Sequence, residues 1–226
     1  MKQTKTNTHT RTRLTLLSLA AALICAAALF GEGALDTASA QRMRARRMPA
    51  PQQPASVDRG TVARAESYTG DRFNFSTQTP RGARVLSVNR PRAEALRAID
   101  DGLADLFDAA RRNNYRAGLN YSDYIVFIAR ADRTRDSTGA YSPDMAFAAG
   151  GYAGTVYERG GQIYAAGMVS SYSPAALVIA EHERDWQRMQ NVVRYEGEHL
   201  ILYHNDRRRF QETSDHARSG AHPILR

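Results

Sequence analysis

The sequence predicts an α+β domain, in which an antiparallel sheet carries helices packed on one face. Three observations support this class. An amphipathic helical pattern follows Pro91, a continuous apolar run occupies residues 124–129, and short strand-like segments separated by glycines precede a second helical pattern. Helix, strands and helix in that order favour a sheet with its helices gathered on one side.

The first long helix is the clearest element in the chain. Only short strands, such as one at residues 83–88, are expected before it. Apolar residues then recur at steps of three and four, as in an amphipathic helix: Leu96, Ile99, Leu103, Leu106, Phe107 and Ala110. Arg111 and Arg112 suit the carboxyl-terminal end of the helix dipole, and Asn113 is a plausible stop.

Several strands are expected in the middle of the chain. Residues 124–129 are β-branched and aromatic, and the run is too short for a core helix, so it predicts a buried central strand. A polar loop follows. Three further strands are expected at residues 145–149, 154–157 and 162–169, and the adjacent glycines at 160 and 161 predict a hairpin between the last two.

A second helix is predicted to begin at Ser173 and Pro174, a typical pair for a helix start. Its apolar pattern comprises Val178, Ile179, His182, Trp186, Met189 and Val193. The helix can extend through residues 199–203, although Gly197 weakens it and a strand at residues 199–203 is the alternative. Asn205 or Asp206 could cap a last short helix.

The first forty residues have the pattern of a secretory signal peptide. Basic residues come first, an uncharged and mostly apolar run covers residues 14–30, and the small residues Ala38, Ser39 and Ala40 form a cleavage site. We expect residues 1–40 to be removed, a mature chain starting at Gln41, and a secreted or periplasmic location. An uncleaved leader is the alternative, and it is the only membrane contact that we expect.

Residues 41–60 are rich in arginine and proline and predict a flexible linker, which leaves residues 61–226 as a single globular domain. The net charge of +8 is modest and spread out, so nucleic acid is not an expected partner. An anionic envelope polymer or polysaccharide is the expected partner. The only cysteine, Cys25, lies in the leader, which excludes disulfides and thiolate chemistry from the mature chain.

Histidine is concentrated in the last quarter of the chain, among carboxylates, and this combination predicts zinc or another divalent metal. The predicted metal ligands are His199, His204, Asp206, His216 and His222, with Glu198 as the catalytic carboxylate. On one continuous helix, Glu196 and His199 would share a face. The His-Glu-x-x-His pattern of many zinc enzymes is absent.

Two functions of different class remain open. The first is an exported, envelope-associated binding or structural module of unknown ligand, favoured by the many tyrosines between residues 115 and 172. The alternative is an exported metal-dependent hydrolase with a carboxyl-terminal histidine and carboxylate site. The chain carries neither a nucleophile elbow nor a phosphate-binding loop of the P-loop type.

Overall fold

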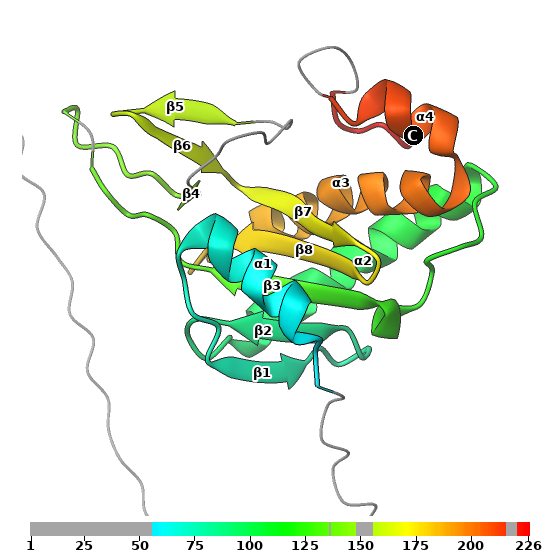
Figure 1. Cartoon of the computed structure of the whole chain (residues 1–226), viewed down its shortest axis with the longest axis horizontal. Helices are drawn as coiled ribbons and strands as arrows, with labels where there is room; N and C mark the ends of the chain where they lie inside the picture. The colour runs from blue at the N-terminus through cyan, green and yellow to red at the C-terminus, as the bar shows by residue number, and fades with distance from the viewer. Residues whose placement is uncertain (1–55, 136, 148–155, 216–220) are drawn as a thin grey trace, which may run out of the picture. The chain divides into compact units, whose positions relative to one another are not determined.

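A five-stranded mixed sheet forms the centre of the domain (Figure 1). The computed structural model describes residues 56–226 apart from 136, 148–155 and 216–220, so the predicted leader and residues 41–55 of the predicted linker lie outside the described residues. The strands, in spatial order, are β1 (Phe75–Gln78), β2 (Arg84–Ser87), β3 (Tyr124–Ala129), β8 (Ala175–Ala180) and β7 (Gly167–Tyr172).

The three central strands β2, β3 and β8 run parallel, and the edge strands β1 and β7 are antiparallel to their neighbours. A separate antiparallel sheet has the order β4-β6-β5. Its strands are β4 (Met145–Phe147), β5 (Tyr157–Arg159) and β6 (Gln162–Ala165). The α+β class is therefore confirmed, but the main sheet is mixed, because β2 and β3 are joined by a helical crossover rather than a hairpin.

Four α-helices are present among the described residues. They are α1 (Arg59–Thr69), α2 (Ala93–Arg112), α3 (Trp186–Asn205) and α4 (Arg207–Thr213), and a short 3-10 turn, η1 (Tyr121–Asp123), precedes β3. None of the helices in the described part of the chain is both long enough and apolar enough to cross a membrane.

Alternate residues of β3 enter two different hydrophobic cores. Val126 and Ile128 belong to the core shared with α2 and α3, whereas Ile125 and Phe127 belong to a second core that includes Ala65 of α1. Figure 1 shows α1 on one face of the sheet, with α2 and α3 on the other. Burial on both faces explains why this strand reads as a continuous apolar run.

Two glycines allow α2 and α3 to pack closely. A Cβ on Gly102 would lie 2.6 Å from the backbone oxygen of Gln190 and 2.9 Å from Cβ of Val193. A Cβ on Gly197 would collide with the end of the Leu106 side chain. Gly197 is thus a packing residue within a continuous helix, and the predicted alternative of a strand at residues 199–203 is wrong.

Two further expectations are corrected. Residues 59–69 form the helix α1, although the end of a linker and short strands are expected there. The helix forms because the Asp58 side chain caps its start and Gly70 ends it in the left-handed conformation at φ 71°. The second long helix does not begin at Ser173, since residues 173–174 form the turn between β7 and β8. It begins at Trp186, where the Asp185 side chain accepts a hydrogen bond from the Arg188 backbone N–H.

Candidate metal centre

The carboxyl-terminal tail is fastened to the middle of α3 by a buried carboxylate. Glu198 is fully buried and accepts hydrogen bonds from the backbone N–H groups of Ile224, at 2.7 Å, and Leu225, at 3.0 Å. Arg194, one turn earlier on α3, pairs with the same carboxylate and donates a hydrogen bond to the Leu225 carbonyl at 2.9 Å. These contacts fix the position of the tail relative to α3.

The same carboxylate also orients His222, which lies on that tail. Nδ1 of His222 donates a hydrogen bond to Glu198 at 2.8 Å. The His222 ring stacks on Tyr195 with ring centroids 5.5 Å apart, and it meets the edge of the His199 ring at 5.1 Å. Because Nδ1 is held by Glu198, Nε2 is the ring nitrogen that His222 can present to a metal ion.

The hydrogen bonds to Glu198 keep it ionised. Burial alone would raise the pKa of Glu198, but hydrogen bonds from His222 and from the Ile224 N–H, together with the charge of Arg194, lower it below its ordinary value. An ionised carboxylate that accepts a hydrogen bond from an imidazole is the usual support for a metal-binding histidine, because it fixes the tautomer and the ring orientation.

Glu196, His199 and His222 form a cluster that could hold a metal ion. One carboxylate oxygen and one nitrogen from each ring all lie within 4.8 Å of one another. Glu196 and His199 are three residues apart on α3 and so share a face of the helix. Ligand atoms about 2 Å from a tetrahedral zinc ion are roughly 3.3 Å apart, so small side-chain rotations would close the cluster on an ion.

The structure brings together only part of the predicted ligand set. His199 and His222 meet, but His204 is exposed at the end of α3 and its Nε2 lies 2.9 Å from the Tyr172 carbonyl oxygen. Asp206 caps α4 and accepts a hydrogen bond from the Tyr115 hydroxyl. His216 lies outside the described residues.

Two carboxylates occupy positions that the predicted ligand set does not anticipate. Glu198, predicted as the catalytic carboxylate, is a buried support for His222. Glu196 is the carboxylate of the cluster, although the predicted ligand set omits it. Its three-residue spacing from His199 was the available signal in the sequence, but which side chain the tail would meet depends on tertiary contacts.

Comparisons of this chain with protein-family models, with curated proteins and with solved structures find no match. The function is therefore inferred from the geometry of the chain itself. That geometry defines a class in broad terms, an α+β domain with a histidine and carboxylate cluster that could hold a metal ion.

Proposed function

We propose that this protein binds one divalent metal ion, with zinc the first candidate, through Glu196, His199 and Nε2 of His222. The observation that carries the proposal is the convergence of the three donor side chains. One carboxylate and two imidazoles are a common ligand set for zinc and for other transition-metal ions. The hydrogen bond from His222 to Glu198 supports it further, since it supplies the carboxylate contact that such ligands commonly make.

The ion would serve to fasten the tail to the domain. Two of its ligands belong to α3 and the third belongs to the tail, so binding would cross-link two parts of the chain that are distant in sequence. After the predicted leader the chain has no cysteine, so an exported form could not be cross-linked by a disulfide. A bound metal ion could supply such a cross-link instead. This role suits a binding or structural module.

Calorimetric titration with zinc tests the proposal. The full-length protein, stripped of metal and carrying no histidine tag, should bind about one equivalent. His199→Ala should abolish this binding, and Glu196→Gln should weaken it by at least roughly tenfold. His204→Ala is the matched control, because His204 is on the same helix but outside the cluster, and it should leave binding unchanged. Equal loss in His204→Ala and His199→Ala would contradict the proposed ligand set.

A metal-dependent hydrolase is the second candidate, and the number of protein ligands is the observation that favours it. Catalytic zinc sites commonly have three protein ligands and a water molecule in the fourth position, whereas structural sites usually have four protein ligands. Cobalt-substituted protein distinguishes the two. Added azide should change the visible spectrum if a ligand position is exchangeable. An unchanged spectrum would exclude the hydrolase and leave the structural role.

A further inference from the structure

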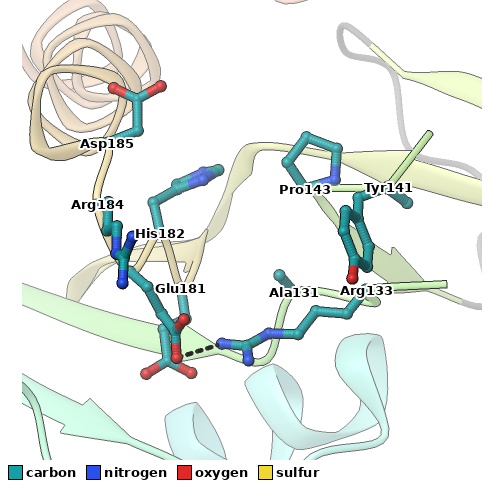
Figure 2. Close-up of a pocket in the computed structure, with 10 residues that line it drawn as sticks. Ala131, Arg133, Tyr141, Pro143, Glu181, His182, Arg184 and Asp185 are labelled. Carbon is teal, nitrogen blue, oxygen red and sulfur yellow. Dashed lines mark ion pairs between the residues drawn. The ribbon is translucent and has the colours of Figure 1, made fainter. Parts of the chain in front are cut away.

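The carboxyl ends of the three parallel strands meet at one edge of the main sheet. The chain leaves β2, β3 and β8 there through residues 88–92, 130–133 and 181–185. Two cavities of about 220 and 480 Å³ open at this edge, and both are lined by Glu181, His182 and Glu183. Figure 2 shows the larger one, with the residues after β8 facing Tyr141 and Pro143. Neither cavity contains a residue of the metal cluster.

Helix α2 begins at the smaller cavity without a side-chain cap. Arg92 occupies the capping position and its side chain makes no capping hydrogen bond. Arg92 and Ala95, from the first turn, both line the cavity. The N–H groups of a first turn lack partners within the helix and carry the positive end of its dipole, so they favour an oxyanion. By contrast, Asp185 caps the start of α3.

Four arginines offset the carboxylates of Glu181 and Glu183, which line both cavities at this edge. Arg90 and Arg92 line the smaller cavity, and Arg133 and Arg184 line the larger one. Glu183 reports their effect, because a hydrogen bond from Arg133 and the charges of Arg133, Arg92 and Arg184 lower the pKa of its carboxyl group. Arg133 and Glu183 form an ion pair at 2.9 Å (Figure 2). This edge therefore already stabilises one carboxylate that belongs to the protein.

His182 supplies an independent indication of a ligand. It follows the end of β8 and lines both cavities, of which Figure 2 shows the larger, and the residue is only 6% exposed. No group among the described residues makes a hydrogen bond to its Nε2. Burial lowers the pKa of His182, so its ring is neutral near pH 7. A buried polar atom without a partner costs free energy, which a hydrogen bond to a ligand would recover.

We infer that this edge binds a small organic molecule through an oxyanion, either a carboxylate or a phosphate. The oxyanion lies at the first turn of α2, near the backbone N–H groups of that turn and near Arg90 and Arg92, which line the same cavity. The apolar part of the ligand lies against Trp186 and Met189 of α3. Nε2 of His182 makes a hydrogen bond to a polar group of the ligand.

Trp186 makes the inference directly testable. It is the only tryptophan in the chain, so its indole N–H gives a single signal in a two-dimensional amide NMR spectrum. The full-length, ¹⁵N-labelled protein is titrated with inorganic phosphate and, separately, with benzoate, at ionic strength held constant with sodium chloride. The indole signal and the amides of residues 93–95 should shift and saturate with at least one probe.

Two variants separate this site from general anion binding. Arg92→Gln should weaken binding about tenfold, which corresponds to about 1.4 kcal/mol. Arg112→Gln is the matched control, because Arg112 is exposed at the opposite end of the same helix, and it should leave the affinity unchanged. Saturation by phosphate alone or by benzoate alone supports the site and identifies its oxyanion. The inference is overturned if neither probe moves these signals, or if Arg92→Gln binds as tightly as the wild type.

Discussion

The carboxylate of Glu198 accepts a hydrogen bond from Nδ1 of His222 at 2.8 Å, and this contact joins the centre of α3 to the carboxyl-terminal tail. Glu198 is fully buried, and it also receives two backbone N–H groups of the tail and the guanidinium group of Arg194. One carboxylate thus holds the tail in place and directs His222 towards His199 and Glu196. The stability of this region, and the metal binding that we propose for it, depend on this carboxylate.

Glu198→Gln should lower the free energy of unfolding by about 3 kcal/mol, because it leaves the buried guanidinium group of Arg194 without a charged partner. Urea denaturation measures the change. The matched control is Glu212→Gln, which breaks an exposed pair between Arg208 and Glu212 with the same four-residue spacing. The control should change stability by less than about 0.5 kcal/mol. If the two variants lose similar amounts of unfolding free energy, Glu198 does not hold the tail in place.

Gly102→Ala should destabilise the domain by about 1–3 kcal/mol, although alanine favours helices more than glycine does. The added Cβ would meet the backbone oxygen of Gln190, which cannot move without shifting α3. Gly197→Ala should cost less, since the atom it meets is the flexible end of Leu106. Thermal denaturation of the two variants checks the order. A Gly102→Ala protein as stable as the wild type would mean that the helices are not in close contact there.

His182 should make stability depend on pH. Burial lowers its pKa in the folded state below the ordinary value of 6.5, and the charge of Arg188 adds to this effect while Asp144 and Asp185 oppose it. The unfolded chain therefore binds a proton at His182 more readily than the folded domain does. The domain keeps its full free energy of unfolding above pH 6.5 and loses part of it as the pH falls towards the pKa of folded His182.

The variant His182→Gln removes this contribution. Its free energy of unfolding, measured by urea denaturation between pH 7.5 and pH 5, should fall less on acidification than that of the wild type. His204→Gln, at an exposed histidine of α3, corrects for the loss of a histidine from the surface. Parallel pH profiles for the wild type and His182→Gln would contradict the proposed burial of a neutral imidazole.

The signal-peptide pattern of residues 1–40 predicts a defined amino terminus for the exported product. If the chain is produced in a bacterium that exports it, amino-terminal sequencing of the product should begin at Gln41, because Ala38 and Ala40 supply the small residues of a cleavage site. Substitution of Ala40 by a bulky residue such as leucine should block processing. If the wild-type product still contains residues 14–30, the leader is an uncleaved anchor instead.

Strong local patterns predicted much of the fold. The apolar spacing from Leu96 to Ala110 predicts α2, the apolar run at residues 124–129 predicts the buried strand β3, and the glycines at 160 and 161 predict the hairpin between β5 and β6. The single strand expected at residues 162–169 is instead two strands, β6 and β7, which belong to different sheets. Residues 175–180 were misassigned to a helix because six consecutive small and apolar residues fit either element. These residues form a strand because they pair with β3, which lies far from them in the sequence.

The candidate site was predicted only in part, for a related reason. The concentration of histidines predicts a site in the last quarter of the chain, and His199 and His222 do meet there. The sequence could not show that Asp206 would cap α4, that Glu198 would face the tail, or that Glu196 would complete the cluster. Each of these outcomes depends on how the tail folds back onto α3, which no local pattern specifies.

The metal content of the native protein shows whether Glu196, His199 and His222 hold an ion. The full-length protein is produced without a histidine tag, purified without chelators and examined by inductively coupled plasma mass spectrometry. About one equivalent of zinc or of another divalent transition metal per chain is predicted, with less than about one tenth of this amount in His222→Ala. A wild-type protein with no stoichiometric metal, which also fails to take up added zinc, would contradict the account.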